Sequence, residues 1–493
     1  MTQPLLDPAA IGELRAALLA AGYTGPGIAG RIGTAGIGAA QRGDLRPARR
    51  ATGAGDPLDT LIRLYVCGDP VARATAEQGL PVAALLDAGL LTGDGPTVSA
   101  GVELEPYGGW WVISDLSSDL RPEQPLPPDH VLGVGAASTT LAQATIRRPV
   151  GRALDLGTGC GVQALHLSTH AASVTATDLS ERALRFAATT AALNGLEWDL
   201  RLGDLAAPVA GERFDLVVSN PPFVTGPGEA TYTYRDSGRP GDAVCAELVA
   251  AAPDLLAAGG TMQFLANWLH VAGEDWADRF AGWLAGTGLD AWVVQREVSD
   301  PVSYVDLWLS DAAEALGSRA KRREVWLDWF DAHRVEAIGL GLVTLRAGGH
   351  DDPSVRLEDL RQPVDQPLGP HIGAWFDRQA WLRAHPSQAL LDARLRAADG
   401  LTLHQEARLG DDGWEVGTQR IALPHGLRWS EEIDPVAVAL VGGCDGRLPL
   451  RAQVDLLAAA HEVPADVLAE VAVPLAAHLV ERGFLEPAVE AAP

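Results

Sequence analysis

Hydrophobic and polar positions follow two different periods along this chain, and the changes of period predict its elements. Residues 5–21 place apolar side chains at helical spacing behind Asp7 and Pro8, which are typical of a helix start. Between about residues 130 and 349, short apolar runs rich in Val, Leu and Ala alternate with longer stretches of helical period. This alternation predicts an α/β fold with a doubly wound, mostly parallel, Rossmann-like sheet covered by helices on both faces.

The predicted sheet divides the chain into three domains. Residues 1–129 contain helices, including ones expected over 57–68 and 75–91, followed by two strands, an order that is similar to a winged helix. A Pro-rich linker over 120–129 is expected to end this N-terminal domain, which we interpret as a substrate or partner domain. Residues 350–493 begin with Pro- and Asp-rich loops and end in helices, which predicts an α+β accessory domain that can also be interpreted as a winged helix.

Two segments outside the strands allow more than one interpretation. Residues 22–50 are rich in glycine, but no GK[ST] follows and no strand precedes, so turns and short helices are favoured over a phosphate-binding loop. Four arginines end this segment, and a solvated loop is favoured over contact with nucleic acid. They are Arg42, Arg46, Arg49 and Arg50.

Within an insertion at 301–334, three tryptophans fit a buried helix face better than base stacking. They are Trp308, Trp326 and Trp329.

Composition narrows the class of protein. The 493 residues are 47% hydrophobic and 21% charged, which is typical of a globular protein with several domains. The net charge is −26 and each predicted domain is acidic, which argues against binding nucleic acid mainly through its phosphates. The four cysteines lie far apart without CxxC spacing, so we expect neither a metal site nor a disulfide framework. No apolar run reaches about 18 residues, so we expect a cytoplasmic protein without a membrane segment.

A glycine-rich loop follows the first strand of the predicted sheet. Gly157, Gly159 and Gly161 precede a helix in a D-x-G-x-G-x-G pattern, and only glycine lets the backbone turn so sharply and approach a ligand. A dinucleotide fingerprint requires its third glycine at the position of Val162. The carboxylate of Asp155, inside the loop, would repel a pyrophosphate but can receive the ammonium of an amino-acid moiety. The loop therefore favours a cofactor other than a dinucleotide.

Acidic residues also end the next two strands. Asp178 is placed to accept both hydroxyls of a ribose, with Leu179 beside an adenine face. Asp204 follows the third strand and can accept the adenine amino group. Three acidic residues at three successive strand ends favour a nucleoside site over solvated strand ends.

In the order and spacing of these motifs, the segment resembles the class I methyltransferases. The resemblance implies S-adenosyl-L-methionine as the cofactor. The cofactor contacts expected on this basis are Asp155, Gly157, Thr158, Gly159, Gly161, Asp178, Leu179, Asp204, Leu205 and Asn220.

The fourth strand ends in a motif suited to transfer to a planar nitrogen. The lone pair of an exocyclic amine or carboxamide is delocalised, so this nitrogen is a poor nucleophile. The Asn220 side-chain oxygen and the Pro221 carbonyl can each accept one N–H, which turns the lone pair toward a methyl donor. Pro221 and Pro222 stiffen the loop, and Phe223 can stack on a planar substrate. We therefore expect the catalytic residues to be Asn220, Pro221, Pro222 and Phe223.

This tetrapeptide resembles the (N/D)PP(Y/F) motif of amino-group methyltransferases. They include adenine-N6 enzymes of DNA and RNA, ribosomal RNA guanine-N2 enzymes of the "methyltransferase small domain" type, and release factor glutamine methyltransferases. The NPPF form is most similar to the last two groups. Residues 234–242 (YRDSGRPGD) are similar to a segment of the release factor enzymes. The resemblance covers about residues 130–300 and leaves the flanking domains unassigned.

Several functions stay open on this evidence. The first is N-methylation of an exocyclic amine of a nucleobase, in ribosomal or transfer RNA rather than DNA. The second is N5-methylation of a protein glutamine, which the acidic charge disfavours less, and DNA adenine-N6 methylation is a further alternative. A winged-helix regulator that only senses the cofactor is disfavoured by the intact motif. The expected partner is thus RNA, a protein or DNA, with no metal and no membrane.

Overall fold

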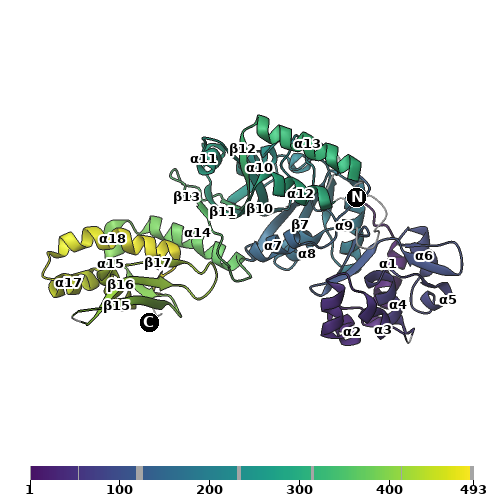
Figure 1. The fold of residues 1–493 in the computed structure, drawn as a ribbon, viewed down its shortest axis with the longest axis horizontal. Coiled ribbons are helices and arrows are strands. Elements are labelled where there is room, and N and C mark those ends of the chain that lie inside the picture. Colours follow the sequence, from purple (N-terminus) through teal and green to yellow (C-terminus); the bar gives the residue numbers. More distant parts are fainter. Residues whose placement is uncertain are drawn as a thin grey trace. The chain divides into compact units, whose positions relative to one another are not determined.

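The structure of the chain is a computed structural model that describes residues 2–53, 55–117, 126–229, 232, 235–311, 316–411 and 413–488. The chain divides into two compact units (Figure 1). The larger unit comprises Met1–Ala142 and Arg148–Leu360, and the smaller comprises Gln143–Arg147 and Arg361–Pro493.

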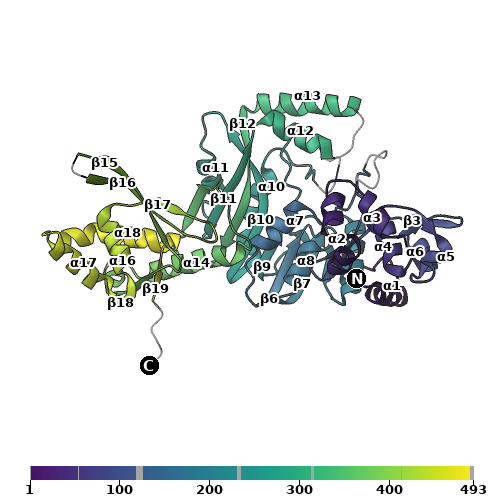
Figure 2. The same cartoon turned by 60° about the horizontal axis from the view of Figure 1, so that its bottom comes forward.

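An eight-stranded sheet forms the centre of the larger unit, in the order β13-β11-β12-β10-β9-β6-β7-β8 (Figure 2). The strands are β6 (Val150–Leu156), β7 (Ala171–Asp178), β8 (Asp199–Leu202), β9 (Phe214–Ser219), β10 (Leu256–Val271), β11 (Asp290–Ser299), β12 (Val335–Arg346) and β13 (Val355–Asp359). Neighbours run parallel except along β12, which is antiparallel to β10 and β11. The doubly wound, mostly parallel α/β fold predicted from the sequence is confirmed.

Helices connect these strands and cover the sheet. They are α7 (Ala136–Ala144), α8 (Val162–Leu167), α9 (Glu181–Asn194), the short η3 (Ala207–Val209), α10 (Ala243–Leu255), α11 (Trp276–Leu284), α12 (Pro301–Asp311) and α13 (Leu316–Ala332). Helix α10 ends at Leu255, and β10 begins with the next residue, Leu256. A Cβ at Gly260 would lie 2.8 Å from the Phe214 carbonyl, so glycine permits the close approach of β10 to β9.

The N-terminal part of the larger unit shares one hydrophobic core with the sheet domain. Its elements are α1 (Pro8–Ala21), α2 (Gly25–Ala40), α3 (Arg46–Ala51), α4 (Pro57–Leu61), η1 (Ile62–Val66), β1 (Val71–Ala72), α5 (Arg73–Ala76), α6 (Val82–Asp87), β2 (Leu91–Thr92), β3 (Thr97–Ala100), β4 (Glu103–Tyr107) and β5 (Trp110–Ser114). Leu14 of α1, Ile113 of β5 and Phe186 of α9 belong to the same buried cluster. The Asn194 amide also pairs with the backbone of Trp111, accepting its N–H at 3.0 Å and donating to its carbonyl at 2.8 Å. Apolar packing and hydrogen bonds therefore both hold the β4–β5 hairpin on α9.

Local signals explain where the N-terminal predictions hold and where they fail. Helix α1 begins behind Asp7, whose side chain accepts the Ala10 N–H, as predicted. The single helix expected over 75–91 is wrong, because Gly79 and Pro81 interrupt it and leave the separate helices α5 and α6. Residues 120–125 of the expected linker lie outside the described residues.

The glycine-rich segment folds into helices, with a break in α2 at Gly33, where φ is 73°. Its arginines do not lie in a loop as expected, because α3 begins at Arg46 and carries three of the four. Arg46 pairs with Asp44 and Arg49 pairs with Asp69, both at 2.8 Å. Part of this positive charge is therefore neutralised locally.

The smaller unit contains two three-stranded sheets, in the orders β18-β14-β19 and β15-β16-β17. Its elements are α14 (Gly369–Ala384), α15 (Ser387–Asp392), β14 (Arg394–Ala397), β15 (Thr402–Gly410), β16 (Gly413–Ala422), β17 (Ser430–Glu432), α16 (Pro435–Gly443), β18 (Asp445–Pro449), α17 (Leu450–Ala460), α18 (Ala465–Arg482) and β19 (Leu485–Pro487). Helices α17 and α18 confirm the predicted C-terminal helices. The expected loops before them are wrong over α14, where Ile372, Trp375 and Phe376 are buried at helical spacing.

Candidate active site

Three glycines shape the loop between β6 and α8. Gly157, Gly159 and Gly161 have φ angles of 73°, 57° and 93°, which residues with a side chain rarely adopt. A Cβ at Gly161 would lie 2.6 Å from the Trp198 ring, so this glycine allows α8 to pack closely. A Cβ at Gly157 or Gly159 would meet no atom within 4 Å. The first two glycines therefore face open space of the kind that a bound cofactor needs.

Asp155 lies beneath this loop and is only 1% exposed. Its Oδ2 accepts the Thr158 hydroxyl at 2.6 Å and the Ala164 N–H at 3.1 Å, so the carboxylate ties the loop to α8. Burial raises the pKa of Asp155 to about 7, and the charge of Asp178 adds to the shift. An ammonium group at this place would stabilise the charged carboxylate.

Asp178 ends β7 and holds the loop from the other side. Its Oδ2 accepts the Gly159 N–H at 2.9 Å, and its Oδ1 accepts the N–H of Ser180 at 2.8 Å. Burial raises the pKa of Asp178. Each carboxylate oxygen can accept more than one hydrogen bond, so both can still receive hydroxyl groups. The adjacent Leu179 is 61% exposed and offers an apolar surface.

The third acidic residue is linked to the segment that follows the NPPF motif. Asp204 accepts a hydrogen bond from Arg239 Nη2 at 2.7 Å, and Arg239 also pairs with Glu247 of α10 at 2.7 Å. The hydroxyl of Thr177 donates to the Leu205 carbonyl at 3.0 Å and fixes the turn after β8. Sequence reasoning missed the arginine partner of Asp204, because the two residues of this pair lie in different loops.

The NPPF motif continues directly from β9 at the same sheet edge as the glycine loop. Ser219 lies opposite Leu156 in the parallel register, and its hydroxyl donates to the Leu156 carbonyl at 2.8 Å. The Oδ1 atom of Asn220 is buried and has no hydrogen-bond partner among the described residues. Such an unpaired buried acceptor costs about 1–3 kcal/mol. The motif therefore presents an oxygen that an incoming N–H can satisfy.

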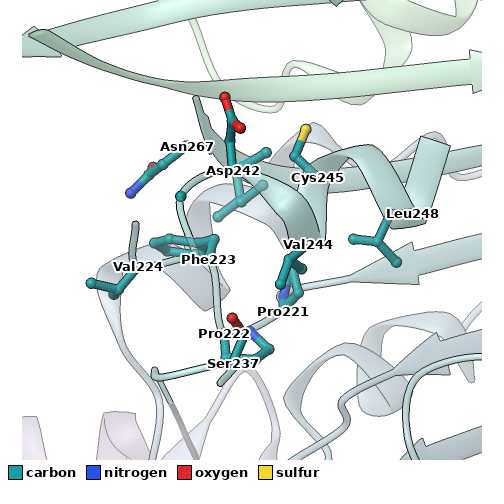
Figure 3. A pocket seen from close by; sticks show the side chains of 13 residues that line it. Pro221, Pro222, Phe223, Val224, Ser237, Asp242, Val244, Cys245, Leu248 and Asn267 are labelled. Atoms are coloured by element: carbon teal, nitrogen blue, oxygen red, sulfur yellow. The ribbon is translucent and has the colours of Figure 1, made fainter. Parts of the chain in front are cut away.

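A small pocket adjoins the motif, and Figure 3 shows the side chains around it. Its lining residues are Pro221, Pro222, Phe223, Val224, Ser237, Gly241, Asp242, Val244, Cys245, Leu248, Leu265, Ala266 and Asn267. Apolar residues contribute most of the side chains, and Ser237, Asp242 and Asn267 add polar groups. Asp242 has a structural role here, because it accepts two hydrogen bonds from Arg279, at 2.9 and 2.8 Å, and the Leu269 N–H at 3.1 Å.

The insertion α12–α13 supports the segment after the motif. The Tyr304 hydroxyl accepts the Thr225 N–H at 2.9 Å and the Asn267 Nδ2 at 2.8 Å, and it lies 3.0 Å from the Thr225 hydroxyl. Tyr304 is fully buried, and burial raises its pKa to about 12. Sequence reasoning missed this residue, for which the only signal was its place in the insertion between β11 and β12.

Tryptophans of the insertion complete this support. Trp308 meets the Phe223 ring edge-on, with centroids 6.0 Å apart. Trp326 is 3% exposed, and Trp308 and Trp329 pack against the same cluster, which confirms core packing. Arg235 donates to the Trp308 carbonyl and so attaches the following segment to α12. Tyr234, which begins the segment compared with the release factor enzymes, lies outside the described residues.

Within the described ranges, no group of three or more His, Cys, Asp and Glu side chains is placed to hold a metal ion. No helix in these ranges is both long and apolar enough to span a bilayer. All four cysteines are buried and unpaired with one another.

Three family models match the chain. Residues 133–274 match the family described as methyltransferase small domain. Residues 20–101 and 373–487 match two families described as domains of unknown function, DUF7059 and DUF7782.

Proteins of assigned activity are similar to about a quarter of the chain. A "Ribosomal RNA small subunit methyltransferase C" of Alcanivorax borkumensis is 33% identical over 117 residues, which cover 24% of this chain and 32% of that protein. A "Release factor glutamine methyltransferase" of Deinococcus radiodurans is 41% identical over 124 residues, covering 24% and 42%. The chain therefore spans less than half the length of each of these relatives. A solved "SAM-dependent methyltransferase from Thiobacillus denitrificans in complex with S-Adenosyl-L-homocysteine" aligns over 43% of this chain and 91% of its own, with 17% identity and a TM-score of 0.26.

The matched range contains the glycine loop, the three acidic strand ends and the NPPF motif. Residues 133–274 are thus similar to the methyltransferase small domain family, and S-adenosyl-L-methionine is the cofactor that this similarity supports.

Proposed function

We propose that this protein methylates the exocyclic amine of a nucleobase in ribosomal or transfer RNA. The observation that carries the proposal is the buried Oδ1 of Asn220, which lacks a partner among the described residues and lies beside the cofactor loop. The similarity to a ribosomal RNA methyltransferase supports the choice of RNA. We propose that the protein acts in the cytoplasm.

Residues at the sheet edge would bind three groups of the cofactor, namely its ammonium, its ribose and its adenine. The bound cofactor supplies a methyl group on a positively charged sulfur. We assign Asp155 to its ammonium group, Asp178 to the ribose hydroxyls and Leu179 to the adenine face. Gly157 and Gly159 leave the open space for it. Asp204 would receive the adenine amino group while it keeps the ion pair with Arg239.

Asn220 and Pro221 would orient the acceptor amine. The Asn220 oxygen and the Pro221 carbonyl each accept one N–H, so the nitrogen lone pair points toward the methyl donor. These acceptors also stabilise the positive charge that develops on nitrogen, and the proton leaves after transfer. Phe223 would stack on the base, held by Trp308.

The N-terminal part would bind the substrate or a partner as a winged-helix-like domain. The order of α4 with η1, β1, α5, α6, β2 and β3, and the strand order β1-β3-β2, support this interpretation. We retain the division into 1–129, a catalytic domain at 130–349 and an accessory domain at 350–493. The exposed arginines of α3 are candidate contacts with the RNA.

Protein glutamine N5-methylation is the second candidate. A carboxamide nitrogen presents the same two N–H groups to Asn220 and Pro221. The net charge of −26 and the similarity to a release factor glutamine methyltransferase favour this candidate. DNA adenine-N6 methylation is a further alternative with the same chemistry.

Replacing Asn220 tests the proposed chemistry. Asn220→Ala removes one acceptor, so we expect kcat to fall at least about 10²-fold while the cofactor dissociation constant changes little. Methyl transfer from labelled cofactor gives the rate, and calorimetry gives the affinity. Asn220→Asp keeps an acceptor oxygen and is the matched control, for which partial activity is expected. Full turnover by Asn220→Ala would contradict the proposed role.

The pKa of Asp155 predicts a pH dependence of cofactor binding. Because its carboxyl has a pKa of about 7 in the free protein, it must ionise to pair with the cofactor ammonium. Between about pH 7.5 and about pH 6 we expect the cofactor affinity to fall about tenfold. Asp155→Asn should flatten this dependence in calorimetry. A wild-type affinity that does not change with pH would show that Asp155 does not pair with the ammonium.

The same pKa predicts the sign of a stability change in the free protein. The folded-state pKa lies above the usual value of 3.8, so folding favours the protonated carboxyl. The stability contribution is fully present below about pH 4 and is lost as pH rises toward about 7. Urea denaturation of wild type and Asp155→Asn across this interval checks the sign.

Tyr304 is expected to act as a positioning residue. Tyr304→Phe leaves the Thr225 N–H and the Asn267 amide without their shared partner, so the segment after the motif loses its anchor. We expect kcat to fall about tenfold, since small misplacements cost rate, with cofactor affinity unchanged. Phe330→Leu, in the same hydrophobic cluster, controls for general destabilisation. An equal loss of kcat in the control would contradict a specific role for the hydroxyl.

The substrate class can be decided by one labelling experiment. The enzyme is incubated with tritiated cofactor and lysate from a deletion strain, and the product is digested with ribonuclease, deoxyribonuclease or protease. Label released by ribonuclease alone is expected. Release by protease alone would replace RNA by the glutamine substrate, and release by deoxyribonuclease alone would indicate DNA adenine.

A further inference from the structure

The β15–β16 hairpin of the smaller unit extends away from the helices of that unit (Figure 2). Strand β17 covers only one end of it, because it pairs with Arg420–Ala422 of β16. Most side chains of both hairpin strands are exposed. The hairpin is therefore an open surface that the unit itself does not cover.

One face of this hairpin carries an apolar patch near the turn. Leu403, Gln405, Ala407 and Leu409 share this face of β15, and the register sets Val416 opposite Ala407 and Trp414 opposite Leu409. The exposed fractions are 43% for Leu403, 70% for Leu409, 72% for Trp414 and 49% for Val416. Leu409, Trp414 and Val416 therefore form an exposed apolar patch of the kind that is typical of an interaction surface.

Strand β15 is also an open edge. It is the outer strand of its three-stranded sheet, and its nine residues contain no proline. The outward N–H and C=O groups of an edge strand can pair with a strand of another chain. The surface therefore offers a backbone ladder as well as apolar side chains.

The charges on this edge fit a second copy of the same strand. Glu406 and Arg408 are exposed on the polar face and make no ion pair in the described part of the chain. Antiparallel pairing about a two-fold axis at Ala407 sets Glu406 opposite the partner's Arg408, and Arg408 opposite the partner's Glu406. Pairing about Glu406 or Arg408 would instead oppose like charges, and a shift by one residue would set polar against apolar faces.

The opposite face is compatible with this register. The small Ala407 side chains of the two copies meet at the axis, and Leu409 lies opposite the partner's Gln405. The result is a six-stranded sheet, β17-β16-β15-β15-β16-β17. We propose that two copies of this chain associate through their β15 edges in this register.

Charge exchange tests the register directly. We expect full-length protein at about 50 µM to sediment as a dimer that dissociates on dilution. Glu406→Arg and Arg408→Glu should each raise the dissociation constant at least about tenfold, because two attractive pairs become two repulsive ones. A mixture of the two single variants should associate again, and so should the double variant Glu406→Arg/Arg408→Glu.

Controls keep this test decisive. Arg420→Glu changes a charge on the same polar face of the central strand and should leave the dimer intact. Ala407→Glu places two negative charges next to each other at the two-fold axis, so this second variant should also weaken association. Circular dichroism checks that each variant is folded. A wild type that stays monomeric, a dimer insensitive to the single variants, or a mixture that fails to associate would overturn the proposal.

Discussion

The parallel pairing of β6 with β9 is the constraint on which the site depends. Because Leu156 lies opposite Ser219, the glycine loop that leaves β6 and the NPPF motif that leaves β9 begin at the same height of the sheet. The Ser219 hydroxyl bound to the Leu156 carbonyl fixes this register in a fully buried position. A slip by one residue would turn alternate side chains to the opposite face and separate the two halves of the site.

Around this pairing, each loop at the sheet edge is held by a neighbour. Asp155 and Asp178 tie the glycine loop to the helices that follow β6 and β7. Arg239 connects Asp204 with α10, and Tyr304 anchors the segment after the motif through Thr225. The Oδ1 atom of Asn220 differs from these groups, because it has no hydrogen-bond partner among the described residues. A buried polar atom of this kind is usually paired, so a bound substrate is the partner that we propose.

The sequence predicts the central fold well because strand and helix periods differ clearly there. It also locates the glycines, the acidic strand ends and the motif, since each directly follows a strand. Contacts between distant segments leave no such local pattern, which is why Tyr304 and the Asp204–Arg239 pair were missed. The β15–β16 hairpin was missed for another reason. Three consecutive polar residues, 404–406, interrupt the apolar positions of β15, so the sequence shows no regular alternation there.

The shared core between the N-terminal part and α9 has a mechanical consequence. Asn194 pairs with the backbone of Trp111, and Ile113 and Phe186 lie in one cluster, so no hinge separates the two parts there. Helix α9 in turn starts three residues after Asp178, the last residue of β7. A substrate bound by the N-terminal part, as proposed, would therefore meet the sheet edge at a set distance. Such a frame would select an acceptor by its distance from the point of binding as well as by its chemistry.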